Sequence, residues 1–478
     1  MQFPLKQIAA VLGCNSVTGT EFPRGEASED NPPVAAESLC PSPNCTVTGW
    51  STDTRTLAPG DLFFALIGPN FDGSAFVAEA FARGAVAAVT AAVHGVEIRG
   101  SLPIQAGCCI VLPDPLSALQ RLAAWARNVW GGDIVAITGS AGKTSTKEVI
   151  ADLLSTRLGV GRTTGNFNNH IGVPLSLLRL PAEARVGVIE IGMNHAGEIR
   201  DLAAIARPRI AVVTNVGYAH VESFADGLEG VARAKRELVE ALPADGIAVL
   251  NADDARVARF THPGETVTFG IDSPAAVRAE EIAFTETGAR FRVEDTRFRT
   301  DLTGRHGVLN ILAGIAVART YGIAPADLVD AVARLKPGRM RGERFTHRGI
   351  LILNDCYNSN PDAARAMIDV LRATPAQRRV AVLGEMLELG RWSEILHREV
   401  GRYAAESGMS VLIGIRGAAS SMVDAAVKAG LAEAAAYFFD TPESAGEHLR
   451  GIAREGDAIL FKGSRGTRVE KALERFVA

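Results

Sequence analysis

One stretch combines the residue types and spacing of a phosphate-binding loop, and it reads Ile134-Val-Ala-Ile-Thr-Gly-Ser-Ala-Gly-Lys-Thr-Ser-Thr-Lys-Glu148. An apolar, strand-like run is followed by a turn of small residues and a helix-forming sequence. Gly139 and Gly142 carry no Cβ atom, so backbone N–H groups can close around phosphate oxygens at the positive end of the helix. Lys143 can then reach the terminal phosphates, and Thr144 can hold Mg²⁺. The residues predicted to bind a nucleotide here are Gly139, Ser140, Ala141, Gly142, Lys143, Thr144 and Ser145.

The spacing of this loop departs from the general phosphate-loop pattern. That pattern has four residues between its glycines, whereas two residues separate Gly139 from Gly142, and Ile137 stands where the first glycine belongs. A glycine-rich turn that only caps a helix would explain the same residues. The strand before the loop and the helix after it favour phosphate binding.

Length and charge limit the class of protein. A chain of 478 residues is too long for one core and should form about three domains. The formal net charge is -4, with 50 Lys and Arg against 54 Asp and Glu, so no global basic field indicates nucleic acid or an anionic membrane as a partner. No apolar run reaches membrane-spanning length, and the first residues lack a signal-peptide pattern. We expect a cytoplasmic protein that is a monomer.

The six cysteines show no Cys-x-x-Cys spacing. Neither a zinc site nor a disulfide framework is therefore indicated, and free thiols are the favoured interpretation.

Strand and helix patterns predict an α/β fold with three domains. Residues 1–111 should form a smaller N-terminal α/β domain, in which the polar interval Thr20–Cys45 is a surface loop. Residues 112–335 should form a central doubly wound, mostly parallel sheet with the phosphate loop. Residues 336–478 repeat the alternation and predict a C-terminal Rossmann-like α/β domain, entered through a hinge at Lys336-Pro-Gly338.

Polar residues follow the strands expected in the central segment, near Val186–Ile191, Ile210–Asn215 and Ile247–Asn251. Ligands bind at the C-terminal ends of parallel strands, so these positions are candidates for a site. Glu190 is a reasonable Mg²⁺ ligand beside a phosphate loop, whereas we assign Asp253 to capping. The other polar residues at these ends are Asn194, His195, Thr214, Asn215, His220 and Asn251.

The helix expected at Gly227–Leu242 places a lysine on its apolar face. Lys235 falls in register with Leu228, Val231 and Leu238. Burial would disfavour the charged amine and leave a neutral, reactive one. On the residues alone, a side chain that runs along apolar neighbours to reach water is the favoured alternative.

A hydroxyl-rich cluster lies at Ser51-Thr-Asp-Thr-Arg55, before Pro59-Gly-Asp61. Such a cluster could bind an anionic sugar nucleotide. A turn in which Ser, Thr and Asp bond to their own backbone is the commoner explanation.

Several motifs together resemble the Mur ligase family over nearly the whole chain. The shortened phosphate loop matches the family's version, and the modified-lysine segment is matched by Ala232-Arg-Ala-Lys-Arg-Glu237. The family's central signatures are similar to Asn166-Phe-Asn-Asn-His-Ile-Gly-Val-Pro174 and Glu190-Ile-Gly-Met-Asn-His-Ala-Gly-Glu-Ile199.

The last segment resembles the branch of the family that adds D-alanyl-D-alanine rather than a single amino acid. The motifs concerned are Asp355-Cys-Tyr-Asn-Ser-Asn-Pro361, Val382-Leu-Gly-Glu-Met-Leu-Glu-Leu-Gly390 followed by His397, and Lys462-Gly-Ser-Arg-Gly466. The sequence departs from the family's usual residues at Ser74, Gly307, Cys356 and Glu385.

The resemblance implies an ATP-dependent amide ligase of peptidoglycan precursor synthesis, with ATP and Mg²⁺ as cofactors. The terminal carboxylate of UDP-N-acetylmuramoyl-tripeptide would become an acyl phosphate, which the amine of D-Ala-D-Ala then attacks. Lys143, Lys235, His220 and Glu190 would be catalytic, and Lys235 would be a carbamate. The implied metal ligands are Thr144, Glu190, His220 and the Lys235 carbamate.

The resemblance also implies ligand contacts for residues outside the phosphate loop. Asn310 and Asp355 would contact adenine and ribose, and Arg339 would approach the ATP phosphates. The substrate-binding residues implied are Ser51, Thr52 and Arg55 for the uridine nucleotide, Asn168 and Asn169 in the central signature, and Tyr357, Asn358 and Asn360 for the dipeptide.

Two kinds of rival function stay open. One is another ligase of the family, which adds a single amino acid, or a folylpolyglutamate synthase. The other is a nucleotide-gated binding protein without ligase activity, which would need neither a buried lysine nor polar strand ends in a third sheet.

Overall fold

The computed structural model describes residues 1–13, 45–91, 108–285 and 287–478, and most of the interval predicted as a surface loop, Thr20–Cys45, lies outside them. These residues divide into two compact units. Unit 1 comprises residues 1–133, 161–189 and 204–207, and unit 2 comprises residues 134–160, 190–203 and 208–478. No helix within the described ranges is both long enough and apolar enough to cross a membrane.

Unit 1 contains a four-stranded parallel sheet with the strand order β3-β4-β7-β8. Leu62, Phe63 and Phe64 of β4 are all buried, which is typical of a strand covered on both faces. Its strands are β1 (Phe3–Pro4), β2 (Thr46–Val47), β3 (Gly49–Ser51), β4 (Asp61–Phe64), β5 (Ile67–Gly68), β6 (Phe71–Asp72), β7 (Ala87–Thr90) and β8 (Cys108–Val111). Its helices are α1 (Leu5–Val11), α2 (Val77–Ala82), α3 (Pro115–Trp130) and α5 (Gly172–Leu178).

The spacing of Leu119, Leu122, Ala126 and Val129 predicts a helix over Leu116–Trp130. Helix α3 begins one residue earlier, because Asp114 accepts a hydrogen bond from the N–H of Leu116 and Pro115 occupies the first turn. Leu119, Leu122 and Ala126 are buried, as the sequence pattern predicts. The pattern is wrong for Val129, which is exposed in the last turn.

The central part of unit 2 is a parallel sheet in which β9, β12, β13, β14 and β15 are neighbours in that order. Helices α4 and α8 pack against each other, and α8 also packs against β13 and β14. The strands are β9 (Asp133–Thr138), β12 (Ile210–Val213), β13 (Ile247–Asn251), β14 (Glu265–Gly270) and β15 (Val277–Arg278). The helices are α4 (Lys143–Leu154), α7 (Leu228–Glu240), α8 (Gly304–Thr320) and α9 (Val329–Arg334).

Four of the elements described contain residues of both units: β9, whose first residue Asp133 belongs to unit 1, and β10 (Val160–Arg162), β11 (Val186–Glu190) and α6 (Glu198–Ala206). The structure has strands β11, β12 and β13 at the positions expected from the sequence, which were Val186–Ile191, Ile210–Asn215 and Ile247–Asn251. The predicted mostly parallel α/β sheet is confirmed.

A separate antiparallel sheet follows in the chain, with the order β16-β17-β18. Its strands are β16 (Glu280–Thr285), β17 (Gly288–Val293) and β18 (Thr296–Thr300). Short strand-like runs at Val267–Phe269, Ile282–Phe284 and Phe291–Val293 predict a side sheet, and the last two are confirmed as parts of its strands. The assignment of Val267–Phe269 to this side sheet is wrong, because these residues belong to β14 and pair in parallel with β13.

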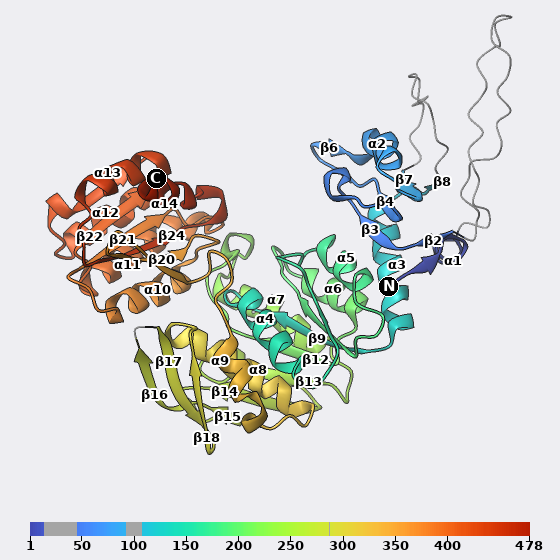
Figure 1. Cartoon of the computed structure of the whole chain (residues 1–478), viewed down its shortest axis with the longest axis horizontal. Helices are drawn as coiled ribbons and strands as arrows, with labels where there is room; N and C mark the ends of the chain where they lie inside the picture. Colours follow the sequence, from blue (N-terminus) through green and yellow to red (C-terminus); the bar gives the residue numbers. More distant parts are fainter. Residues whose placement is uncertain (14–44, 92–107, 286) are drawn as a thin grey trace, which may run out of the picture. The chain divides into compact units, whose positions relative to one another are not determined.

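The last part of unit 2 is a six-stranded sheet with the order β19-β20-β24-β21-β22-β23, parallel except for β19. Helices α13 and α14 lie on one side of it, and α10 and α11 lie on the other (Figure 1). The edge strands β19 and β23 are not predicted from the sequence. The strands are β19 (Glu343–His347), β20 (Ile350–Asp355), β21 (Arg378–Gly384), β22 (Val411–Ile415), β23 (Ala436–Phe439) and β24 (Asp457–Lys462). The helices are α10 (Pro361–Ala373), α11 (Ser393–Glu406), α12 (Ala419–Lys428), α13 (Pro442–Ile452) and α14 (Glu470–Val477).

Candidate functional site

The turn between β9 and α4 has the backbone of an anion-binding loop. Gly142 caps α4 with φ of 80°, and no side chain caps the first turn, which also lacks an acidic residue. A Cβ atom on Gly139 would lie 1.8 Å from Oγ1 of Thr214, so only glycine fits against the end of β12. The helix therefore presents its positive end to a loop that leaves room for an anion.

The residues that follow β12 hold this loop in place. Asn215 accepts the N–H of Ala141 at 2.8 Å and donates to the carbonyl of Ala141 at 3.0 Å, while Thr214 Oγ1 donates to the same carbonyl at 2.7 Å. Ser140 Oγ donates to the carbonyl of Gly217 at 2.9 Å and accepts the N–H of Gly217 at 2.8 Å. Thr214 and Asn215 thus fix the shape of the loop, which explains why polar residues follow this strand.

Three predicted residues meet at the loop. Lys143 Nζ donates to the carbonyl of Gly139 at 2.8 Å, and Thr144 Oγ1 donates to Oε2 of Glu190 at 2.8 Å. Burial lowers the pKa of Lys143. The negative charge of Glu190 opposes this shift, and the positive charge of Arg341 reinforces it. A hydroxyl and a carboxylate beside a phosphate loop are suitable ligands for Mg²⁺. Within the described residues, no group of three or more His, Cys, Asp and Glu side chains could hold a metal ion, so a metal here would need other ligands as well.

Lys235 lies on the buried face of α7, with 2 % of its surface exposed, whereas Arg233, Arg236 and Glu240 are exposed. In the described part of the chain no acidic side chain forms an ion pair with it. Burial lowers the pKa of Lys235 well below its usual value, and the charge of Lys143 lowers the pKa further. The side chain therefore does not reach water along its apolar neighbours, and burial makes its amine easier to deprotonate than an exposed lysine.

Replacement of this lysine should stabilise the fold near neutral pH. The pKa of Lys235 is lower in the folded chain than in the unfolded chain, so between those two values the unfolded state binds more protons and wild-type stability rises with pH. Lys235→Met removes this penalty. We expect the variant to unfold a few degrees above wild type at pH 7, without nucleotide or bicarbonate, and the difference to shrink as the pH approaches about 10, the usual lysine range. Calorimetric unfolding at pH 7, 8 and 9 measures this.

Lys147 provides a matched control for that measurement. It is also fully buried, but its Nζ lies 2.8 Å from Oε1 of Glu148. Lys147→Met should therefore give no gain that shrinks with pH. A pH-independent gain for Lys235→Met, or a loss of stability at pH 7, would contradict the assignment of a neutral amine.

His220 lies opposite Glu388, one of the polar residues that follow the strands expected in the last segment. Its Nδ1 lies 2.8 Å from Oε2 of Glu388, which belongs to the loop after β21. The hydrogen bond from His220 lowers the pKa of Glu388. Nothing local in the sequence pairs these residues, because 168 positions separate them.

The residues predicted for adenine and ribose have protein partners. Asn310, buried in α8, accepts a hydrogen bond from Thr146 Oγ1 at 3.0 Å. Asp355 accepts from Nζ of Lys462 at 2.5 Å, and Lys462 also donates to the carbonyl of Asn358 at 2.9 Å. Burial lowers the pKa of His306, in the first turn of α8, with Asp355 opposing and Lys462 reinforcing the shift. The first turn of α8 and the end of β20 therefore belong to one polar region.

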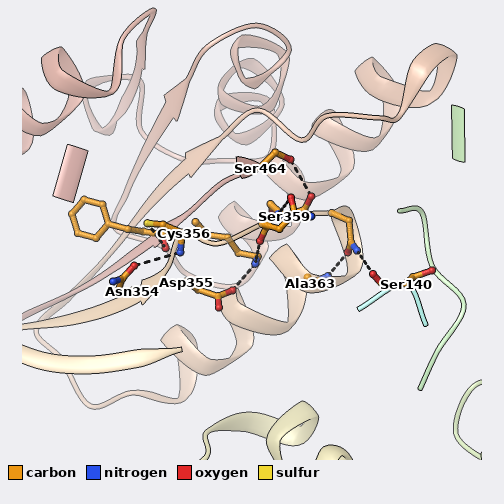
Figure 2. Close-up of polar contacts among 11 residues, drawn as sticks. Ser140, Asn354, Asp355, Cys356, Ser359, Ala363 and Ser464 are labelled. Carbon is orange, nitrogen blue, oxygen red and sulfur yellow. Dashed lines mark hydrogen bonds and ion pairs between the residues drawn. The ribbon is translucent and has the colours of Figure 1, made fainter. Parts of the chain in front are cut away.

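The segment after β20 reaches the phosphate loop. Asn360 accepts the N–H of Ala363 at 2.9 Å as the cap of α10, and its Nδ2 donates to the carbonyl of Ser140 at 3.4 Å (Figure 2). Ser464 Oγ donates to the carbonyl of Ser359 at 3.1 Å in the same region (Figure 2). Asn358 accepts the N–H of Ser359. Of the predicted dipeptide residues, Asn360 therefore contacts the loop that would hold phosphate, and Tyr357 is half-buried in the same segment.

Arg341 is a candidate that the sequence did not indicate. Its guanidinium lies 3.7 Å from the centre of the Tyr357 ring, and its charge acts on Lys143. The predicted residue, Arg339, is exposed and has no hydrogen bond or ion pair within the described ranges. Arg339 and Arg341 are two positions apart in one turn. The periodicity of the sequence does not predict which of the two guanidinium groups faces the phosphate loop.

The free thiol of Cys356 is buried directly after β20, and its Sγ lies 3.5 Å from the carbonyl of Phe461. Burial raises the pKa of this thiol. The thiol therefore packs as a small apolar group.

The predicted substrate residues of unit 1 make local contacts. Ser51 Oγ donates to the carbonyl of Asp53 at 2.9 Å, and Arg55 forms an exposed ion pair with Asp53 at 2.6 Å. The half-buried Thr52 lies between them. This is the turn that bonds to its own backbone, the commoner of the two explanations that the sequence left open.

Asn169, also in unit 1, accepts the N–H groups of Ile171 and Gly172 and so holds the start of α5. Its neighbour Asn168 is half-buried. In unit 2, Asp253 accepts the N–H groups of Ile271, Asp272 and Ser273, so its carboxylate holds a turn, in keeping with a structural role.

Three family models match the chain. The description of the first is Mur ligase family, catalytic domain, over residues 46–127. The second is the Mur ligase middle domain, over residues 137–318, and the third is Mur ligase, glutamate ligase domain, over residues 338–465.

Curated relatives and solved structures match at high coverage. The UDP-N-acetylmuramoyl-tripeptide--D-alanyl-D-alanine ligase of Bacillus subtilis is 32 % identical over 435 residues, which cover 90 % of this chain and 93 % of the relative. A crystal structure of MurF from Acinetobacter baumannii has a TM-score of 0.80 and 30 % identity, covering 90 % of this chain and 94 % of the other. The MurF ligase of Thermotoga maritima in complex with ADP has a TM-score of 0.76 and 29 % identity, covering 92 % and 98 %. The chain therefore belongs to the Mur ligase family.

Proposed function

We propose that this chain is an ATP-dependent amide ligase that joins D-Ala-D-Ala to the terminal carboxylate of UDP-N-acetylmuramoyl-tripeptide in peptidoglycan precursor synthesis. The relative from Bacillus subtilis bears the name of this activity, and the matched structure from Thermotoga maritima was solved with ADP. The observation that carries the proposal is a phosphate loop in which Lys143 interacts with a second, buried lysine, Lys235, that has no acidic partner in the described structure. A nucleotide switch has no use for such a lysine.

The reaction proceeds in two displacements. An oxygen of the tripeptide carboxylate bonds to the γ-phosphorus of ATP and the bond to ADP breaks, which gives an acyl phosphate. The amine of D-Ala-D-Ala then bonds to the carbonyl carbon, the bond to phosphate breaks, and the amine releases a proton. Lys143 and the N–H groups at the start of α4 stabilise charge on the transferring group.

The cation site that we propose is built on Thr144 and Glu190. When bound there, Mg²⁺ would neutralise charge on the phosphates. Thr144 and Glu190 already meet at 2.8 Å, so the donor set suits a hard cation.

Lys235 supplies the remaining anionic oxygen ligand in this proposal. Its neutral Nζ bonds to the carbon of CO₂ and releases one proton, which converts a buried amine into a carbamate with two oxygens. Together with His220, the carbamate would hold a second Mg²⁺. The negative charge of the buried carbamate would be balanced by the positive charge of the metal.

Further ligand contacts follow from the family resemblance. Asn310 and Asp355 would contact adenine and ribose, and Arg339 would approach the phosphates. Tyr357 and its neighbours Asn358 and Asn360 would bind the dipeptide, since their segment already contacts Ser140. The residues proposed for the uridine nucleotide and the rest of the donor are Ser51, Thr52, Arg55, Asn168 and Asn169.

Organisation and location complete the proposal. We take the domains as residues 1–111, 112–335 and 336–478, and the protein as a cytoplasmic monomer. Its substrates, ATP and UDP-linked precursors, are cytoplasmic compounds, which supports the location.

Arg341 should matter more for ATP than Arg339. We expect Arg341→Ala to raise the KM for ATP about tenfold and Arg339→Ala to raise it less, because Arg341, unlike Arg339, stacks on Tyr357 and its charge acts on Lys143. Steady-state kinetics with varied ATP measures both. Equal effects would contradict the expected difference, and a larger effect at Arg339 would assign the phosphate contact to Arg339.

Phosphate release from ATP tests the proposed function. The assay contains Mg²⁺, UDP-N-acetylmuramoyl-tripeptide and D-Ala-D-Ala, each component is omitted in turn, and the mass of the product is measured by mass spectrometry. We expect release to need every component and the product to gain the mass of a dipeptide. Release with a single amino acid or a folate would keep the ligase chemistry and overturn the substrate. No release with any acceptor would favour the nucleotide-gated binding protein.

A further inference from the structure

Two loops of unit 2 meet at three points. They are the segment after β12, residues 217–227, and the loop after β21, residues 385–392. Nδ1 of His220 lies 2.8 Å from Oε2 of Glu388, and the N–H of Glu222 donates to the carbonyl of Glu388 at 3.4 Å. The guanidinium of Arg391 donates to the carbonyl of Ala225. The contact therefore joins backbone and side chains of both loops.

The backbone at this contact adopts conformations that side chains rarely take. His220 has φ of 60° and Glu388 has φ of 63°, so both residues of this side-chain contact are in the left-handed region. A Cβ atom on Gly390 would lie 2.7 Å from Cβ of Glu222, so glycine permits the close approach of the loops. Strained residues persist where the surrounding structure fixes them, and they often lie at functional sites.

Buried side chains hold the backbone of the loop that carries Glu388. His397, which has no exposed surface, accepts the N–H of Met386 at 2.9 Å through Nε2. Ser464 Oγ accepts the N–H of Leu387 at 3.0 Å. The two backbone positions before Glu388 are therefore held by buried side chains, so the carboxylate is presented in one place.

We propose that Glu388 is a positioning residue of the ligase reaction, which holds the imidazole of His220 in the orientation that catalysis needs. The carboxylate accepts from Nδ1 and so leaves the lone pair on Nε2, the tautomer that a metal ligand requires. Because Glu388 follows β21 and His220 follows β12, the orientation of the ring then depends on contact between the two loops. This inference rests on the proposed function.

The kinetic test compares Glu388→Ala and Glu388→Gln with Glu222→Ala. Glu222 is an exposed glutamate two residues from His220, and its side chain forms no ion pair among the described residues, so its loss makes the same change in charge. We expect Glu388→Ala to lower kcat about 10- to 100-fold with the KM for ATP nearly unchanged, the range found when such partners of metal ligands are removed. Glu388→Gln keeps a hydrogen-bond acceptor, so its kcat should fall less. The kcat of Glu222→Ala should stay within twofold of wild type.

A double variant separates positioning from general damage. If Glu388 acts through His220, Glu388→Ala should have no further effect on single-turnover rates in a His220→Ala background. Additive losses would overturn the inference, as would a Glu388→Ala rate equal to that of Glu222→Ala.

Trp392 offers a readout that needs no turnover. It ends the short helix Gly390–Trp392, and a Cβ atom on Gly227 of the facing segment would lie 3.4 Å from its ring. We expect Glu388→Ala to increase acrylamide quenching of Trp392, isolated by subtraction of the Trp392→Phe spectrum, and Glu222→Ala to leave it unchanged. Unchanged quenching in Glu388→Ala would overturn the proposed contact. If Glu388→Ala differed from wild type in quenching but the wild-type enzyme formed no ligation product, the proposed function would be overturned and the loop contact would stand.

Discussion

Lys235→Ala should lose about 10²–10³-fold in kcat while ATP binding is retained. The lost group would be an anionic ligand that stabilises charge during phosphoryl transfer, and losses of this size follow removal of single stabilising groups. Lys235 lies on α7, outside the phosphate loop, so the nucleotide should still bind. The measurement is product formation at saturating substrates together with calorimetric titration of ADP.

Short carboxylic acids distinguish a carbamate from an amine at this position. Formate or acetate should restore part of the activity of Lys235→Ala, because a small carboxylate can occupy the space of the missing carbamate. Lys147→Ala serves as the control, since Lys147 is equally buried but paired with Glu148, and no acid should restore any loss there. If Lys235→Ala kept activity within twofold of wild type, Lys235 would have no role in the reaction. If activity were lost and no acid restored it, the carbamate would be excluded.

Lys143→Met should lose at least about 10²–10³-fold in kcat and should also bind ATP more weakly. Lys143 is the loop's own cation, bonded to the carbonyl of Gly139, and in the reaction two anions must meet beside it. Lys143→Arg should recover little, because a planar guanidinium does not replace a compact ammonium in a tight loop. Single-turnover rates with excess enzyme measure the chemical step.

The control for this prediction is Lys428→Met, which removes an exposed lysine in the last turn of α12. It should leave kcat within twofold of wild type. If Lys143→Met kept a tenth or more of wild-type kcat, the loop would not carry the phosphoryl transfer, and the alternative of a helix-capping turn would regain support.

Local sequence patterns predicted those features that depend on neighbours along the chain. The strand, loop and helix around Gly139 and Gly142 follow from one short stretch, and the structure has β9, the loop and α4 at those residues. The burial of Lys235 follows from its register with Val231 and Leu238, because helical periodicity fixes which face a residue occupies.

Contacts between distant segments could not be read from the same patterns. The pairs His220 with Glu388 and Asp355 with Lys462 join residues more than 100 positions apart. The first depends on contact between two loops, and the second depends on which strands become neighbours within one sheet. Short segments were ambiguous for another reason. Val267–Phe269 has the composition of a side-sheet strand, and only its pairing with β13 places it in the parallel sheet.

The most direct test of carboxylate activation follows oxygen from the donor to phosphate. UDP-N-acetylmuramoyl-tripeptide labelled with ¹⁸O in its terminal carboxylate is incubated with the enzyme, ATP, Mg²⁺ and D-Ala-D-Ala, and the released phosphate is analysed by mass spectrometry. The acyl phosphate route predicts one ¹⁸O atom in each phosphate released, because the attacking carboxylate oxygen leaves with the phosphorus. Phosphate without label, or release at the same rate without the tripeptide, would contradict the proposed ligase reaction.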